Sequence, residues 1–245
     1  MNDSKDAATA NSKQGFPLLD DIAQGLLDGR VIPFLGAGAS VMASSASGAD
    51  LWGIPSAQTL ATKMAEHIGI SADVPCKSKM LEKAPDLQSI FDDMACTGLD
   101  LATVASAYEK TVGRDFLRQF LHKRLNVSCS PTRLHRCMAS LPGPAFIVTT
   151  NYDCLMERAF EAANVKYHLV VYPADRKDLY GKVLYKEPGK GNPRECFSNE
   201  LFIDLSREKV LFKMHGSLSE SENNETNSDG DDDHYVITDE NYIDF

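Results

Sequence analysis

A glycine-rich turn follows a short apolar run near the start of the chain. Residues 31–40 read VIPFLGAGAS, in which Gly36, Ala37, Gly38 and Ser40 follow the apolar residues. Because glycine has no side chain, the backbone there can turn sharply and bring its N–H groups close to an anion. A strand that leads into such a turn is how dinucleotide-binding folds hold a pyrophosphate. The third glycine of the G-x-G-x-x-G pattern is missing, so an ordinary strand-to-helix turn is the alternative.

Two further apolar runs end in polar residues that could do chemistry. Residues 146–153 read FIVTTNYD and bring Asn151 and Asp153 to the end of a run, and residues 210–216 read VLFKMHG and bring His215 to the end of another. In an open α/β sheet, ligands bind beyond the carboxyl ends of the strands. Three such strands are therefore expected to end at one crevice, which predicts an α/β fold with a Rossmann-like parallel sheet.

The ordered motifs GAGAS, TTNYD, MHGS and ITDENYIDF resemble those of the sirtuin-like (silent information regulator) superfamily. The closer likeness is to the zinc-less NAD-hydrolase branch found in bacterial anti-phage defence proteins, and it extends from about Phe16 onward. The resemblance implies a Rossmann-like parallel sheet flanked by helices. It also implies a helical insertion in place of the zinc ribbon of protein-deacylase sirtuins, and NAD⁺ as the substrate.

Each candidate catalytic residue has a role that the resemblance implies and a structural alternative. Asn151 matches the asparagine that lies against the nicotinamide-side ribose, although it could instead cap the following helix. His215 matches the histidine of the family's His-Gly pair and could take a proton from a ribose hydroxyl or from water, whereas a histidine in an apolar strand can also be structural. Asp153 would hold the ribose or the glycine-rich loop, or else lie at a helix N-terminus.

Two segments are expected to bind NAD⁺. Ser40 and the backbone N–H groups of Gly36–Gly38 would cradle phosphate. Ile54, in a Gly-Ile-Pro sequence, matches the segment that sirtuins have just after their cofactor-binding loop. The Asp-Phe-Arg that completes this segment in protein deacylases is absent, because residues 56–58 are Ser-Ala-Gln.

The implied reaction is cleavage of the bond between nicotinamide and ribose in NAD⁺. Nicotinamide leaves as a neutral molecule, so the protein must chiefly stabilise an oxocarbenium-like centre and position a nucleophile. The missing zinc cysteines and Asp-Phe-Arg favour water as that nucleophile. We therefore predict an NAD⁺ glycohydrolase that depletes NAD⁺ in anti-phage defence by abortive infection. The alternatives are an NAD-dependent protein deacylase and a non-catalytic module that senses NAD⁺ or ADP-ribose.

Composition bounds the class of protein. A chain of 245 residues with 43% hydrophobic residues can form one α/β domain with a substantial core. The net charge of −10 argues against direct nucleic-acid binding by this domain. Six cysteines show no C-x-x-C pair, so no metal is expected. No apolar run approaches a membrane span and no signal peptide is evident, so we expect a cytoplasmic protein without membrane partners.

The motifs divide the chain into expected segments. We expect a disordered tail at 1–15 and a sirtuin-like NAD-binding domain at 16–245, with a helical insertion at about 57–128. A disordered loop is expected at about 219–233, which holds seven acidic and no basic residues. Related domains usually continue into another strand and helix, so we expect these to be missing here. An NAD⁺ hydrolase must not poison its own host, which predicts a homo-oligomer and a sensor or regulatory domain or partner protein.

Apolar periodicity places further elements around the motifs. Residues 31–35 are expected to be a strand buried on both faces, and residues 166–172 a further strand. Residues 175–200 are polar and punctuated by Gly and Pro, which predicts a long loop or an insertion. Helices are expected at 18–27, after an N-cap at Ser56, within 87–126, at 131–141 and at 154–163. The expected core of 87–126 consists of Val104, Tyr108, Phe116, Phe120, Leu121 and Leu125.

Overall fold

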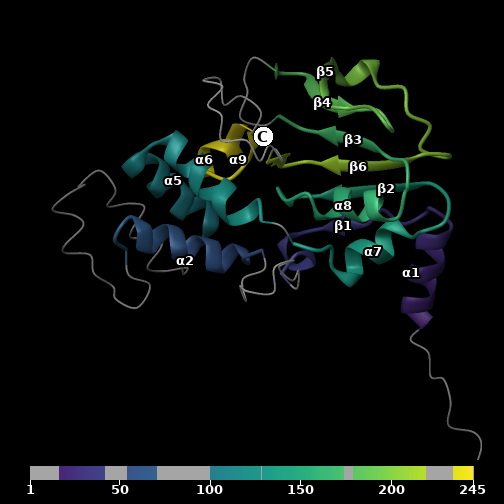
Figure 1. The fold of residues 1–245 in the computed structure, drawn as a ribbon, viewed down its shortest axis with the longest axis horizontal. Helices are drawn as coiled ribbons and strands as arrows, with labels where there is room; N and C mark the ends of the chain where they lie inside the picture. Colours follow the sequence, from purple (N-terminus) through teal and green to yellow (C-terminus); the bar gives the residue numbers. More distant parts are fainter. Residues whose placement is uncertain are drawn as a thin grey trace, which may run out of the picture.

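The computed structural model describes residues 17–41, 54–70, 100–127, 129–173, 179–218 and 234–244 (Figure 1). The helices are α1 (Pro17–Leu27), α2 (Ala57–His67), α5 (Leu101–Val112), α6 (Arg114–Leu125), α7 (Arg133–Ala139), α8 (Leu155–Ala162) and α9 (Asp239–Asp244). The strands are β1 (Phe34–Leu35), β2 (Ala145–Thr149), β3 (His168–Val171), β4 (Lys182–Lys186), β5 (Arg194–Phe197), β6 (Lys209–Lys213), β7 (Gly216–Ser217) and β8 (His234–Tyr235). The expected tail and acidic loop lie outside the described residues.

Six strands form one mostly parallel sheet in the order β1-β2-β6-β3-β4-β5. The first four of these strands are parallel, whereas β4 and β5 are antiparallel to their neighbours. The parallel strands β2, β3 and β6 are short apolar runs, as is typical of strands in the interior of an α/β sheet. The predicted Rossmann-like sheet flanked by helices is confirmed.

A long loop or an insertion was expected at 175–200, and the described part of this segment contains a β-hairpin that extends the sheet. Residues 182–186 and 194–197 form β4 and β5, which pair as an antiparallel hairpin. In β4 the side chains alternate, so that Val183 and Tyr185 are buried while their neighbours are half-buried. This alternation is the signature of a strand, and the Gly and Pro residues mark the hairpin connections.

The expectation that residues 31–35 form a strand buried on both faces is wrong. Only Phe34 and Leu35 pair with β2, and β1 lies at the edge of the described sheet. Phe34 is 62% exposed and Ile32 57% exposed. The apolar run therefore leads to an open edge, because no described strand covers the other side of β1.

The two faces of the sheet have separate cores. On one face, Ile147 and Leu211 pack against Met138 of α7 and Phe160 of α8. On the other face, the core is made by residues of β3, β4, β5 and β6, with Leu201 and Ile203 packed against it. Helices α7 and α8 therefore fix β2 and β6, the strands that lead to the candidate site.

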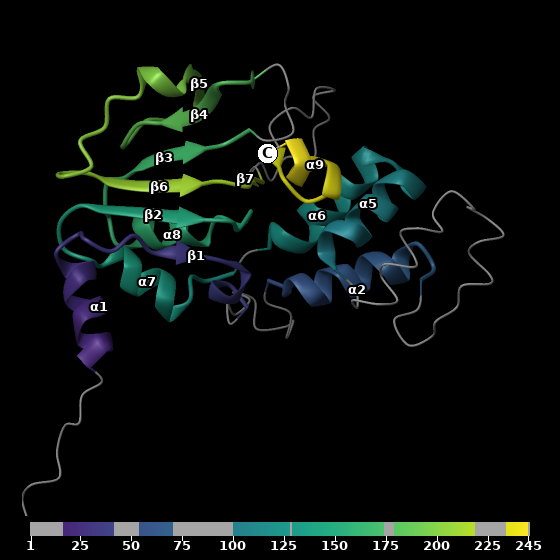
Figure 2. The same ribbon diagram turned by 180° about the vertical axis from the view of Figure 1, so that it is seen from behind.

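A helical module of α2, α5 and α6 lies beyond the carboxyl ends of β2, β3 and β6 (Figure 2). Ser56 caps α2 as expected, because its hydroxyl accepts a hydrogen bond from the N–H of Thr59. Tyr108 and Leu121 are fully buried in the module, but Phe116, expected in the core, is 58% exposed. The sequence pattern of α6 thus misplaced Phe116, which lies at the edge of the apolar stripe.

Candidate functional site

The carboxyl ends of β1, β2 and β6 lie side by side, so the three sequence motifs meet. The N–H of Thr150, just after β2, donates to the carbonyl of Leu35 over 3.0 Å. The N–H of Met214, just after β6, donates to the carbonyl of Thr149 over 3.0 Å. This is the edge at which ligands bind in open α/β sheets.

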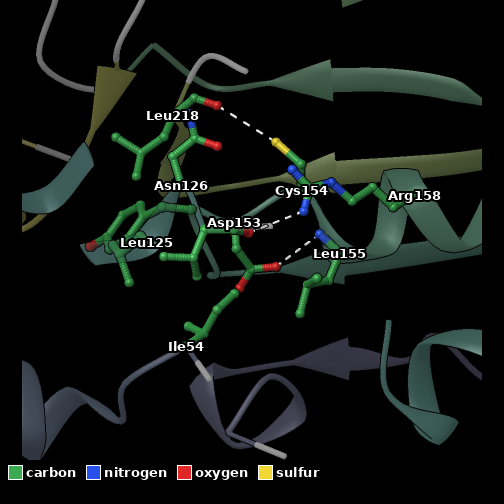
Figure 3. Close-up of a pocket in the computed structure, with 10 residues that line it drawn as sticks. Ile54, Leu125, Asn126, Asp153, Cys154, Leu155, Arg158 and Leu218 are labelled. Carbon is green, nitrogen blue, oxygen red and sulfur yellow. Dashed lines mark hydrogen bonds between the residues drawn. The ribbon is translucent and has the colours of Figure 1, made fainter. Parts of the chain in front are cut away.

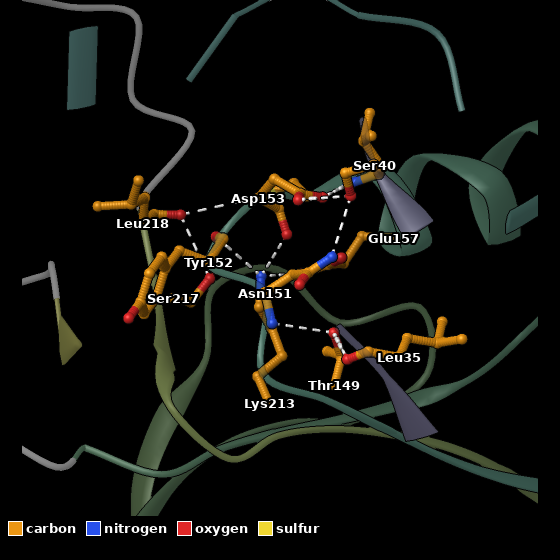
Figure 4. Close-up of polar contacts among 12 residues, drawn as sticks. Leu35, Ser40, Thr149, Asn151, Tyr152, Asp153, Glu157, Lys213, Ser217 and Leu218 are labelled. Atoms are coloured by element: carbon orange, nitrogen blue, oxygen red, sulfur yellow. Dashed lines mark hydrogen bonds and ion pairs between the residues drawn. The ribbon is translucent and has the colours of Figure 1, made fainter. Parts of the chain in front are cut away.

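A buried chain of hydrogen bonds joins the glycine-rich loop to the end of β2 (Figure 4). Asn151 Nδ2 donates to Ser40 Oγ over 3.0 Å, and Ser40 Oγ donates to Asp153 Oδ2 over 2.8 Å. Ser40 is fully buried, and Asn151 and Asp153 are each 8% exposed. Three residues that the sequence analysis selected separately therefore form one polar cluster.

Asp153, and not Asn151, contacts the start of the helix after β2, whose N-cap residue is Cys154. Asp153 Oδ1 accepts a hydrogen bond of 3.0 Å from the N–H of Leu155, the first residue of α8. Asn151 instead uses one donor of its amide for Ser40. An amide carries two donor hydrogens and an acceptor oxygen, so within the described part of the chain Asn151 keeps a donor and an acceptor for further hydrogen bonds.

Backbone contacts fix the position of Asn151. Its N–H donates to the hydroxyl of Thr149 over 3.0 Å, and that hydroxyl donates to the carbonyl of Leu35 over 3.2 Å. The turn after β2 is therefore held against the end of β1 by side-chain as well as backbone hydrogen bonds. Such a network places the amide of Asn151 with little freedom.

The glycine-rich loop adopts ordinary backbone geometry. Gly36 is extended, with φ −113° and ψ −175°, and Ala37–Ala39 form one 3-10 turn. The chain turns directly after β1, and neither Gly36 nor Gly38 has a positive φ. A Cβ on Gly38 would meet no atom within 4 Å. The open backbone at Gly38 gives a ligand room to approach.

Thr132 and His135 hold this loop from α7. The hydroxyl of Thr132 donates to the carbonyl of Ala39 over 3.1 Å and shares a hydrogen bond of 2.8 Å with His135 Nδ1. His135 is 2% exposed, and its burial lowers its pKa. Both residues belong to the capping box of α7, and the T-x-x-H spacing was the available sequence signal.

His215 follows β6 and lies against α9. Its ring packs edge-on against the ring of Tyr242, with centroids 5.4 Å apart. The N–H of Val236 donates to its carbonyl over 3.0 Å, which ties the residue to the segment after β8. Burial lowers the pKa of His215, so the imidazole is neutral at pH 7 and able to accept a proton.

Ile54 and Asp153 line the same small cavity, between α6 and the start of α8 (Figure 3). Its volume is about 10 Å³, which is room for one water molecule. A dinucleotide does not fit in this cavity. Ile54 is 6% exposed and belongs to the core of the helical module.

A buried lysine that the sequence analysis missed contacts the backbone of the cluster. Lys213, the last residue of β6, is fully buried, and its Nζ donates to the carbonyl of Asp153 over 2.7 Å and to the carbonyl of Tyr152 over 3.2 Å. It also pairs with the Glu157 carboxylate of α8 over 2.8 Å. Burial disfavours the charge of Lys213, but Glu157, Cys154 and Asp153 together outweigh that effect and raise its pKa. The sequence feature that could have identified Lys213 is its charge inside the apolar run VLFKMHG.

The described part of the chain offers no group of three or more His, Cys, Asp or Glu side chains that could hold a metal ion. Within the same residues, no helix combines the length and the apolar character that crossing a membrane requires. The expected absence of a metal and the catalytic and binding roles of the site residues stay predictions.

Comparison with known proteins bears on the second half of the chain. Residues 145–245 match the model of the SIR2-like domain family, a range that includes Asn151, Asp153 and His215. The match supports the resemblance to the sirtuin-like superfamily, and SIR2-like domains use NAD⁺. A comparison with curated proteins found no match.

Proposed function

We propose that this protein is an NAD⁺ glycohydrolase, which cleaves the nicotinamide–ribose bond and transfers the ribose to water. The observation that carries the proposal is the buried chain from Asn151 through Ser40 to Asp153, at the carboxyl ends of parallel strands. This chain connects the loop at Gly38, where a ligand has room to approach the backbone, to the amide of Asn151. The SIR2-like match over residues 145–245, which include Asn151 and His215, supports NAD⁺ as the substrate.

The chemistry needs positioning more than a strong acid. The C1′–N bond breaks, its electron pair leaves with neutral nicotinamide, and a water oxygen bonds to C1′ to give ADP-ribose and one proton. Asn151 would hold the ribose or the attacking water, since an amide both donates and accepts hydrogen bonds. His215, neutral because burial lowers its pKa, would take the proton.

The remaining site residues would bind rather than react. The backbone N–H groups of Gly36–Gly38 would face the pyrophosphate, where the space at Gly38 lets a ligand approach. The side chains of Ser40 and Asp153 form hydrogen bonds with each other, with Asn151 and with the first N–H of α8. We assign these two residues to holding the loop and Asn151 in place.

The proposed biological role is that of a cytoplasmic NAD⁺-depleting effector in anti-phage defence, and it follows from the resemblance of the ordered motifs. Such an effector requires control by assembly or by a partner. Exposed apolar side chains on α1 and beside β1 support a homo-oligomer, because burying them removes apolar surface from water. They are Leu18, Leu19, Ile22, Leu27, Ile32 and Phe34.

One incubation separates the proposed hydrolase from its alternatives. The purified chain, over a range of concentrations that spans assembly, is mixed with NAD⁺ and an acetylated lysine peptide. Equal amounts of nicotinamide and ADP-ribose, with the peptide still acetylated, are expected. Deacetylated peptide formed together with nicotinamide would show a deacylase, and binding of NAD⁺ without nicotinamide at any concentration would show a sensing module.

A further inference from the structure

A second hollow lies in the helical module, on residues that do not line the cavity beside Asp153. Its volume is about 480 Å³, within the roughly 300–1,000 Å³ that small-molecule sites occupy. Helices α2 and α6 provide its walls, and Tyr108 of α5 contributes between them. The nine lining residues are Lys63, Glu66, His67, Tyr108, Phe116, Gln119, Phe120, Lys123 and Arg124.

Aromatic rings give the hollow a fixed floor. The Nδ1 of His67 and the hydroxyl of Tyr108 share a hydrogen bond of 2.5 Å, and Tyr108 is fully buried. The ring of Phe120 stacks on His67 with centroids 5.8 Å apart and lies 5.3 Å from the ring of Tyr108. Three mutually packed rings cannot collapse into the space, so the hollow is pre-formed.

Cations dominate the charge around this floor. Lys63, Lys123 and Arg124 line the hollow with one carboxylate, Glu66. Helix α6 carries four Lys or Arg residues and one Asp, in a chain whose net charge is −10. The guanidinium of Arg124 lies 5.6 Å from the centre of the Phe120 ring, which holds it at the hollow. A guanidinium held in this way suits bidentate contact with phosphate.

Two residues of α6 remain open to a ligand. Phe116 is 58% exposed although it lines the hollow, so a planar ring could stack on it. Gln119 lies one turn along the same face, and its amide can both donate and accept hydrogen bonds. The apolar ring of Phe116 suits the face of a base, the amide of Gln119 suits the polar edge of a base, and the cluster of cations suits phosphates.

We propose that this hollow binds a nucleotide, with its base on Phe116 and its phosphates at Lys123 and Arg124. The side chain of Gln119 contacts the edge of the base, and Lys63 adds charge from α2. The site is separate from the cluster of Ser40, Asn151 and Asp153. The proposal does not depend on NAD⁺ cleavage and can hold if that function fails.

Calorimetric titration of the full chain with ATP tests the proposal. ATP is expected to bind, and Lys123→Glu/Arg124→Glu should weaken binding at least about tenfold, since charge-assisted contacts to phosphate are lost. The milder Lys123→Gln/Arg124→Gln and Phe116→Ala variants should also weaken it. The matched control is Lys190→Glu/Arg207→Glu, which makes the same charge change at exposed residues outside the hollow.

Further titrations test whether a nucleotide binds in this hollow. Asn151→Ala should keep ATP affinity, which shows that the ATP is not in the cluster at β2. The proposal is overturned if wild-type protein binds no ATP, if the control weakens binding equally, or if inorganic tripolyphosphate binds as tightly as ATP. Binding of a peptide with the sequence of residues 219–233 in place of ATP would assign the hollow to an acidic chain instead.

Discussion

Asn151 donates a hydrogen bond of 3.0 Å to Ser40, a residue 111 positions earlier in the chain. The bond joins the loop after β1 to the turn after β2, and it is shielded from solvent at both ends. Ser40 in turn donates a hydrogen bond to Asp153, whose Oδ1 accepts one from the N–H of Leu155 at the start of α8. The glycine-rich loop, the amide and the helix therefore form one rigid unit, to which a ligand can bind without reordering the chain.

Gly38→Ala is expected to abolish NAD⁺ cleavage with little change in melting temperature. A Cβ at this position meets no protein atom within 4 Å, and φ is not positive, so the fold tolerates it. A bound pyrophosphate would collide with the methyl group. The control is Gly191→Ala, which also has open space around its Cβ but lies outside the site. If Gly38→Ala cleaves NAD⁺ normally, no ligand occupies the space at the loop.

The pH profile of NAD⁺ cleavage should report on His215. Burial holds its pKa below the ordinary value of 6.5, and the neutral ring is the active form, so activity should fall as pH drops through a midpoint below 6.5. Tyr242→Ala uncovers the ring and should move that midpoint upward, toward 6.5, whereas Tyr242→Phe keeps the ring contact and the wild-type midpoint. An acidic limb that does not move in Tyr242→Ala would argue that another group titrates.

Lys213→Met should destabilise the fold by about 3–5 kcal/mol at pH 7, because it leaves Glu157 charged and buried without its partner. Burial raises the pKa of Glu157, so this loss should shrink as the pH falls and the carboxyl is protonated. Denaturant titration at pH 7 and pH 5 measures both effects.

The matched control for the Lys213–Glu157 pair is a more exposed lysine–glutamate pair, between Lys182 of β4 and Glu195 of β5. Lys182→Met removes the ion pair with Glu195, whose side chains are 30% and 47% exposed, and should cost at most about 1 kcal/mol. Lys213→Met/Glu157→Leu should regain much of the loss, since no buried charge remains. Equal losses for Lys213→Met and Lys182→Met would show that the buried pair does not hold the site.

Leu18→Glu/Ile22→Glu should convert the proposed homo-oligomer to a monomer in light scattering. The two side chains lie one helical turn apart on α1 and are 70% and 41% exposed. The introduced charges should therefore destabilise the assembly and leave the fold of the monomer intact. Tyr180→Glu/Phe202→Glu, at sites 90% and 93% exposed, is the control. A wild-type monomer, or an assembly that survives the α1 change, would contradict this surface as the interface.

Sequence patterns located the site better than they described its surroundings. The strands that precede Asn151 and His215 could be predicted because each is an apolar run followed by polar residues. Their meeting follows from the geometry of a parallel sheet. The partners of Ser40 could not be predicted, since a hydrogen bond across 111 residues depends on how the strands pair.

Other features depended on tertiary contacts. Lys213 is a charged residue inside an apolar run, but its partner Glu157 on α8 could not be identified from the sequence. The exposure of Phe34 depends on β1 lying at the edge of the described sheet, which the apolar run does not reveal. The β4–β5 hairpin was hidden by the Gly and Pro residues that connect its strands.

Nicotinamide release by Asn151→Ala and His215→Ala tests the central claim most directly. Both residues are proposed to act on the reacting ribose and its nucleophile, so each variant should lose about a hundred- to ten-thousand-fold in rate while melting close to wild type. Asn199→Ala and His122→Ala, at residues outside the site, should release nicotinamide at the wild-type rate. Near-wild-type release by Asn151→Ala and His215→Ala, with normal melting, would contradict the proposed catalytic site.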